Sequence, residues 1–232
     1  MRDLIIGASL LGKLLMPVNN GILPYVAPIA YGEIINHSQP QETILAKRTL
    51  DLTKRNPIKE VNEIFRDNIL LILHYLKGDE KEMLDEDGSV KWEEVKRPFE
   101  VDFTLNPGET FAFHDKFLAE FEGKVKKTIP VGYRRDEGFE VVDGLFGNGV
   151  CHLATLANWV ASEAGLKTVA LVNHDFFPVP EIPREYGVSI YYTGDRDARR
   201  QNLYITNDFD FPVEFKFLVN REKVELKIIK LF

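Results

Sequence analysis

Apolar and polar residues alternate along two neighbouring stretches near the C-terminal end of the chain. The apolar members are Val213, Phe215, Phe217 and Val219 in the first stretch, and Val224, Leu226 and Ile228 in the second. An alternation of period two places every second side chain on the same face of a β-strand. The pattern predicts a hairpin with one buried face that turns at residues 220–222.

Two other stretches have the three-to-four-residue spacing of a helix with one apolar face. The first runs to Gly78, with Asn56 as a possible N-cap and Pro57 at the first position. The second runs from Cys151 to Ala164 and ends at Gly165. We also predict an earlier helix over residues 41–55.

Short strands are predicted in the second half of the chain, and their expected positions are 101–105, 110–113, 169–172, 188–192 and 203–206. The charged stretch 79–97 is typical of an exposed linker. We therefore expect an α+β fold in which N-terminal helices pack on a mostly antiparallel sheet, with one buried helix that starts at Cys151. The expected divisions are an extended N-terminal arm (1–40), a helical region with a charged linker (41–97) and a main domain (98–232).

Composition excludes several classes of protein. The 232 residues are 44% apolar, which excludes collagen-like and disordered chains. A net charge of −7 argues against a nucleic-acid partner. A single cysteine excludes an internal disulfide, a cysteine-rich zinc site and an iron–sulfur cluster. We expect no metal or other cofactor.

The first thirty residues contain the most apolar stretch of the chain, but Lys13 interrupts it and Asp3 cancels the charge of Arg2. We expect no stable membrane span, and an ordered arm is favoured over an export signal or anchor. The cellular compartment stays open.

The single cysteine, Cys151, lies at a predicted helix start directly after Gly147, Asn148 and Gly149. A thiol at this position faces unpaired N–H groups and the positive end of the helix dipole, which favour the thiolate. The glycines can aim N–H groups at an oxyanion. A structural role as a small apolar core residue is equally consistent with the pattern. A phosphate-binding loop is disfavoured, because no Lys-Ser/Thr pair follows.

A cysteine nucleophile needs a base, and the chain offers His37, His74, His114, His152 and His174. His174 is preferred, because a strand that returns from the Cys151 helix can place its end near the helix start. His152 is on the same helix and points away from the sulfur. Candidates for a third group that orients the imidazole are Asp143, Asp175, Asp195 and Asp197.

Several segments match one family in the correct order. Residues 105–113 (LNPGETFAF) and 144–153 (GLFGNGVCHL) are its two central motifs, followed by His174, by residues 194–198 (GDRDA) and by the closing hairpin. The chain resembles the VanW-like domain family over about residues 98–230. It departs from the family pattern at His152, where the family has Gln, at Asn148 for Gly and at Ala112 for Ser.

The resemblance implies a function on the bacterial cell wall, since some VanW-like domains are cysteine L,D-transpeptidases that cross-link peptidoglycan. It implies that Cys151 attacks a stem-peptide carbonyl, that His174 carries the proton and that Asp197 holds His174. The implied binding residues are Gly147, Asn148, Gly149, His152 and Arg196. Two alternatives remain: a non-catalytic module that binds peptidoglycan or glycopeptide, and a Cys-His peptidase or amidase.

Overall fold

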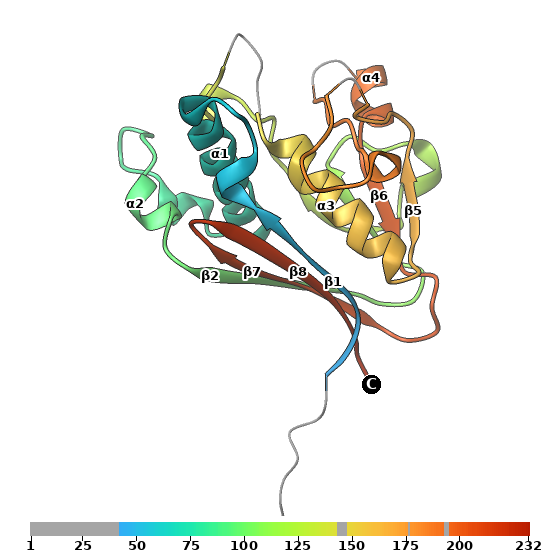
Figure 1. Ribbon diagram of the computed structural model, residues 1–232. Coiled ribbons are helices and arrows are strands. Elements are labelled where there is room, and N and C mark those ends of the chain that lie inside the picture. Colours follow the sequence, from blue (N-terminus) through green and yellow to red (C-terminus); the bar gives the residue numbers. More distant parts are fainter. Residues whose placement is uncertain (1–41, 143–147, 176, 193–194) are drawn as a thin grey trace, which may run out of the picture. The chain divides into compact units, whose positions relative to one another are not determined.

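The computed structural model describes residues 42–142, 148–175, 177–192 and 195–232, with only the backbone for residues 195–197. The described residues form one compact unit (Figure 1). The N-terminal arm predicted for residues 1–40 lies outside the described residues.

The first sheet has four antiparallel strands in the order β1-β8-β7-β2. Their bounds are Thr43–Asp51 (β1), Phe99–Leu105 (β2), Val213–Asn220 (β7) and Lys223–Lys230 (β8). The predicted hairpin is confirmed as β7 and β8, with the predicted face buried. Phe103 of β2 is opposite Phe215 of β7, and their rings stack 4.8 Å apart.

The helix predicted for residues 41–55 is wrong, because this segment forms β1 and a following 3-10 helix. β8 offers an edge with unpaired backbone groups, and β1 satisfies them along its length. Leu50 is fully buried while Lys47 and Arg48 are exposed, as expected for an edge strand protected by charges. The predicted 41–97 region thus contributes a strand to the sheet formed by the 98–232 region.

The second sheet has the order β4-β3-β6-β5, and only the β3–β4 pair is parallel. Its strands are Thr110–His114 (β3), Val125–Ile129 (β4), Lys167–Ala170 (β5) and Leu203–Thr206 (β6). Residues 188–192, predicted as a strand, are not part of either sheet. The N–H groups of Val188 and Ile190 bond to side chains of α3, as described below, and those of Ser189 and Tyr191 donate to the carbonyls of Val172 and Gln201.

The two long helices are α1 (Lys59–Lys77) and α3 (Val150–Glu163), and both were predicted. Gly78 ends α1 in the left-handed conformation, and its N–H donates to the His74 carbonyl. Figure 1 shows both helices over one face of the first sheet, with α3 between that sheet and the second. The predicted α+β class is confirmed, with two sheets rather than one.

The remaining helices are short. They are α2 (Trp92–Val95), α4 (Asp195–Arg200) and the 3-10 helices Leu52–Lys54, Glu80–Met83, Ala119–Phe121, Arg135–Glu137 and Arg184–Tyr186. The charged stretch 79–97 is therefore not a simple exposed linker: Val95 is fully buried, and Lys96 pairs with Asp67 of α1 at 2.9 Å. Among the described helices, none is both long and apolar enough to cross a bilayer.

Candidate functional site

The N-terminus of α3 lies directly against α1. Its N-cap, Gly149, has φ +96°, and a Cβ at this position would lie 2.5 Å from the Phe65 carbonyl oxygen. A side chain would meet both backbone strain and a collision with α1. Gly149 therefore permits the close approach of the two helices that sets the position of Cys151.

The chain leading into α3 is fixed to α1 by Asn68, which is fully buried. Its amide nitrogen donates to the carbonyls of Glu140 (2.9 Å) and Asn148 (3.0 Å), and its amide oxygen accepts from the Glu140 N–H. The Asn148 side chain in turn accepts from the Val142 N–H at 3.3 Å. Asn148, predicted as a binding residue, thus has a local structural bond. Gly147 lies outside the described residues.

The Cys151 sulfur contacts the backbone of Ile190. It accepts from the Ile190 N–H at 3.4 Å, and the thiol faces the Ile190 carbonyl oxygen at 3.7 Å. Farther along the same helix face, the Thr155 hydroxyl accepts from Val188 N–H (3.0 Å) and the Asn158 amide donates to Tyr186 carbonyl (2.9 Å). We call these three side chains the α3 ladder. They bond to residues 186–190, which overlap the strand predicted for residues 188–192.

The prediction of a lowered pKa for Cys151 is wrong. Burial raises the pKa of the thiol above its ordinary value, because the thiolate would lose its hydration. The bonds from the Ile190 N–H and from the backbone of Cys151 itself act in the opposite direction but are weaker. At rest, the sulfur carries its proton.

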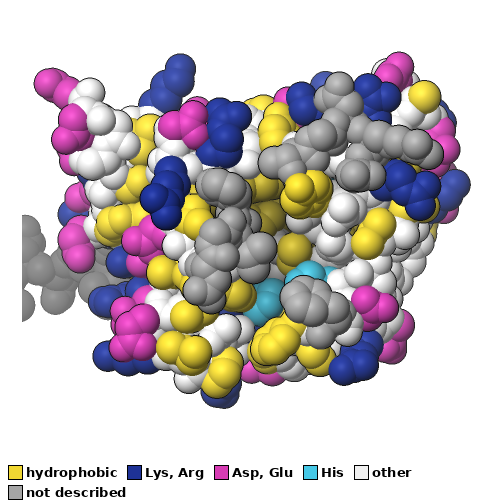
Figure 2. Space-filling view, turned by 90° about the horizontal axis from the view of Figure 1, so that it is seen from above, with side chains coloured by type: hydrophobic (Ala, Val, Ile, Leu, Met, Phe, Trp, Pro, Cys, Tyr) yellow, Lys and Arg dark blue, Asp and Glu magenta, His cyan; other side chains and the backbone are white. Residues whose placement is uncertain are grey.

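The structure brings His152 and His174 together. Their ring centroids lie 6.2 Å apart with the rings nearly perpendicular, and His152 also meets the edge of Phe65 at 5.3 Å. His152 is buried, whereas His174 is half-buried. Figure 2 shows histidine side chains reaching the surface near the middle of the upper face, beside apolar side chains.

His152 is kept neutral. Burial, followed by the charges of Arg55 and His174, lowers the pKa of His152 to about 3. A ring with so low a pKa is a poor proton acceptor for a thiol. The low pKa of His152 argues against His152 as the base.

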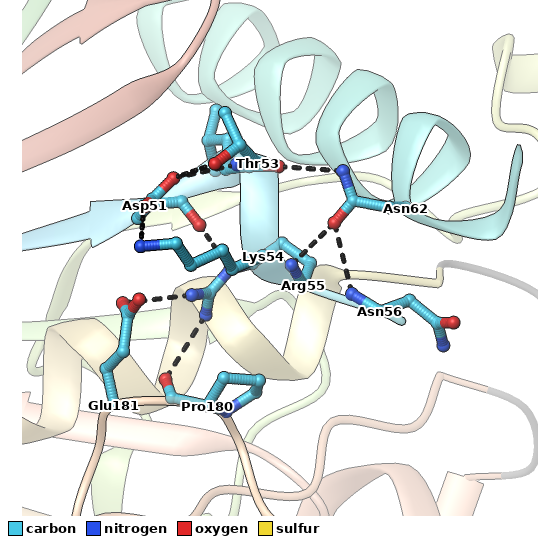
Figure 3. A network of polar contacts seen from close by, with 9 residues as sticks. Asp51, Thr53, Lys54, Arg55, Asn56, Asn62, Pro180 and Glu181 are labelled. Carbon is cyan, nitrogen blue, oxygen red and sulfur yellow. Dashed lines mark hydrogen bonds and ion pairs between the residues drawn. The ribbon is translucent and has the colours of Figure 1, made fainter. Parts of the chain in front are cut away.

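Sequence reasoning missed Arg55, which is fully buried and whose charge acts on His152. Figure 3 shows its polar contacts. Its guanidinium donates to the Asp51 carbonyl at 2.6 Å and to the Pro180 carbonyl at 3.4 Å, and it pairs with Glu181 at 3.0 Å. Glu181 has φ +72°, an uncommon conformation for a non-glycine residue. Arg55 was expected inside a helix, so its pattern gave no sign of burial.

Asp197, the predicted third catalytic group, lies in a stretch for which only the backbone is described. Within the GDRDA segment, residues from Asp195 onward begin helix α4. The side chains of Arg196 and Asp197 are not described, so their roles remain proposals. Asp175 is exposed. Within the described ranges, no three His, Cys, Asp or Glu side chains are grouped as metal ligands.

The family model described as VanW like protein matches residues 101–229, more than half of the chain. The chain belongs to this VanW-like family, and this membership identifies it as a peptidoglycan-related domain. Neither the curated proteins nor the solved structures contain a match.

Proposed function

We propose that this domain transfers an acyl group between peptidoglycan stem peptides through a thioester on Cys151. The sulfur attacks the carbonyl that precedes the terminal D-residue of a donor peptide, so that a C–S bond forms and the C–N bond breaks. The amine of the D-residue leaves with a proton. An acceptor amine then attacks the thioester, forms the new amide bond and releases the thiol.

One observation carries the proposal: the only cysteine of the chain lies in the first turn of α3, where Gly149 lets the helix begin in close contact with α1. The first N–H groups of a helix have no partners within it, and they can stabilise an oxyanion. The paired rings of His152 and His174 lie at the same helix start.

The raised pKa of Cys151 determines how the proton moves. Because the resting sulfur is a thiol, the base must remove the proton while the C–S bond forms. We assign this step to His174, which then passes the proton to the leaving amine. Asp197 would accept a hydrogen bond from His174 and stabilise the imidazolium.

The test is intact-mass analysis after incubation with a tetrapeptide muropeptide, together with measurement of released D-alanine. We expect a thioester adduct on the parent protein and none on Cys151→Ala. His174→Ala should slow the reaction by at least about 10²-fold, the effect of a lost general base. His152→Ala is the matched control and should mainly change substrate preference. Equal losses for both histidine variants would contradict the assignment of the base.

A second candidate is a non-catalytic peptidoglycan-binding module, and the α3 ladder favours it. Cys151 has the same kind of backbone contact as Thr155 and Asn158, which is the pattern of a structural residue. A binding module should retain its affinity for muropeptide after the thiol is alkylated. A Cys-His hydrolase would instead release the same products whether or not an amine acceptor is added.

A further inference from the structure

Tyr133 has a strained backbone that its surroundings hold in place. Its φ is +59°, in the left-handed region that bulky residues rarely adopt. The carboxylate of Glu137 accepts the N–H groups on both sides of it, from Gly132 at 2.9 Å and from Arg134 at 2.9 Å. Tyr75 of α1 fixes the Glu137 backbone with a 2.8 Å bond. Such strain persists only where several contacts enforce it, and it is concentrated at functional sites.

The Tyr133 ring is packed in the core, but its hydroxyl is not used there. The ring packs edge to face with the rings of Phe139 and Tyr192, at distances between ring centroids of 5.7 Å and 6.1 Å. The residue is 4% exposed, and its hydroxyl oxygen is buried with no hydrogen-bond partner among the described residues. A buried hydroxyl without a partner is costly, and phenylalanine would fill the same space without that cost.

The backbone of Ile190, which contacts the Cys151 sulfur, lies two residues before Tyr192, and the Tyr192 ring packs against the Tyr133 ring. Burial raises the pKa of Tyr133, and negative charge on four acidic groups would raise it further: these are Cys151, Tyr192, Asp115 and Glu137. Together with burial, they keep Tyr133 protonated, so it can donate a hydrogen bond at any physiological pH. The Tyr192 hydroxyl is already engaged with Asp115 at 2.9 Å. Of these two phenols, only that of Tyr133 is therefore available to the sulfur.

We infer that Tyr133 belongs to the Cys151 site and donates its phenol hydrogen to the sulfur when the thiol loses its proton. This inference rests on the proposed function and deepens it. The resting thiol already receives the Ile190 N–H. A buried thiolate needs further donors to replace its lost hydration, and the free hydroxyl supplies one. The bond forms as the proton leaves for His174 and persists until the sulfur is acylated.

Tyr133→Phe tests the inference without any substrate, because Cys151 is the only cysteine and its alkylation is site-specific. Iodoacetamide alkylation is measured across the pH range in which the thiol ionises. Loss of a donor to an anion should slow alkylation below the midpoint by about tenfold or more and shift the midpoint upward. Superimposable pH curves for the two proteins would overturn the inference.

The melting temperature gives a second test, with Tyr204→Phe as the matched control. The Tyr204 hydroxyl is bonded to the Leu118 N–H at 3.0 Å and to the Arg199 carbonyl at 2.8 Å. Its removal should lower the melting temperature and leave alkylation unchanged. Tyr133→Phe should melt at the parent's temperature or above it. A drop equal to that of Tyr204→Phe would show that the Tyr133 hydroxyl already has a partner, and would also overturn the inference.

The muropeptide assay separates this inference from the proposed function. If the parent forms no thioester, the acyltransferase proposal fails, while the alkylation curves still report on Tyr133. If the parent forms a thioester and Tyr133→Phe forms it at the same rate, the function stands and the inference fails.

Discussion

The first sheet and the segment between β4 and β6 differ in how their backbone N–H and C=O groups find hydrogen-bond partners. In the sheet the partners are neighbouring strands, whereas in the segment many of them are side chains. In β7 and β8, residues pair in register from Val213↔Lys230 to Asn220↔Lys223, and the apolar side chains alternate regularly. The described part of residues 130–202 contains α3 but only one short strand, and side chains of Asn68, Glu137 and the α3 ladder bond to its irregular backbone.

The two regions differ in how much backbone strain and how many buried polar groups they contain. The sheet contains regular strands and stacked aromatic rings, with no positive-φ residue other than glycine along them. The site region contains both of the non-glycine positive-φ residues in the described chain, Tyr133 and Glu181, and it contains the buried His152, whose pKa is lowered to about 3. The sheet stabilises the domain, and the site region uses some of that stability to hold its polar groups.

The largest effect is expected from truncating the sheet core. Phe215→Ala should lower the free energy of unfolding by about 3–5 kcal/mol, because the ring is fully buried and stacked on Phe103. Phe65→Ala, at the half-buried ring beside His152, should cost clearly less. Denaturant titration measures both losses. Equal losses would show that the sheet core does not contribute more to stability than the site region.

The second effect concerns pH. His152 binds its proton with a pKa of about 3 in the folded state and about 6.5 in the unfolded state, so only the unfolded chain gains from protonation between these values. Stability should therefore fall as the pH drops from 6.5, by about 3 kcal/mol at pH 4 from this group. His152→Gln should remove that part of the acid lability. Parallel curves of stability against pH for the parent and the variant would show that His152 does not cause this loss of stability in acid.

A third change attacks the start of α3. Gly149→Ala introduces a side chain at φ +96° and places its Cβ against the Phe65 carbonyl, so a loss of about 2–3 kcal/mol is expected. Gly78→Ala is the control: it has the same backbone strain, at φ +90°, but open space around the new Cβ. If both variants lose equal stability in thermal unfolding, the close contact between α1 and α3 contributes nothing.

The smallest effect is expected in the α3 ladder. Thr155→Val keeps the shape of the side chain but leaves the Val188 N–H without its acceptor, at an expected cost of about 1–2 kcal/mol. Hydrogen exchange should report faster exchange of the Val188 amide, with the amides of β7 unaffected. Unchanged protection of Val188 would show that the Thr155 hydroxyl does not hold this segment in place.

The elements predicted correctly from the sequence are those whose patterns are local. The β7–β8 hairpin, α1 and α3 each carry their periodicity and their terminating glycine or turn within one segment. β1 was missed because its partner lies at the far end of the described chain. Strand formation there depends on the free edge of β8, which the local sequence does not encode.

The candidate site was predictable only in part, for a similar reason. Cys151 was found because glycines mark the helix start, and His174 because it follows a returning strand. The buried environments of Arg55 and Tyr133 depend on contacts with other parts of the chain: Glu181 pairs with Arg55, and Glu137 binds the backbone on both sides of Tyr133. The only local sign of close packing at Tyr133 is the preceding Gly132. A Cβ added at that glycine would lie 3.2 Å from the Tyr192 ring.

The pairing of β1 with β8 has a consequence for the order of folding. Thr43 pairs with Lys230, so this edge of the sheet closes a loop that contains nearly all of the described chain. Contacts so distant in sequence form slowly, because the entropy of loop closure must be overcome first. During synthesis the sheet cannot close until β8 has emerged. Since α3 packs between this sheet and the second one, the helix that bears Cys151 receives its full cover only in that final step.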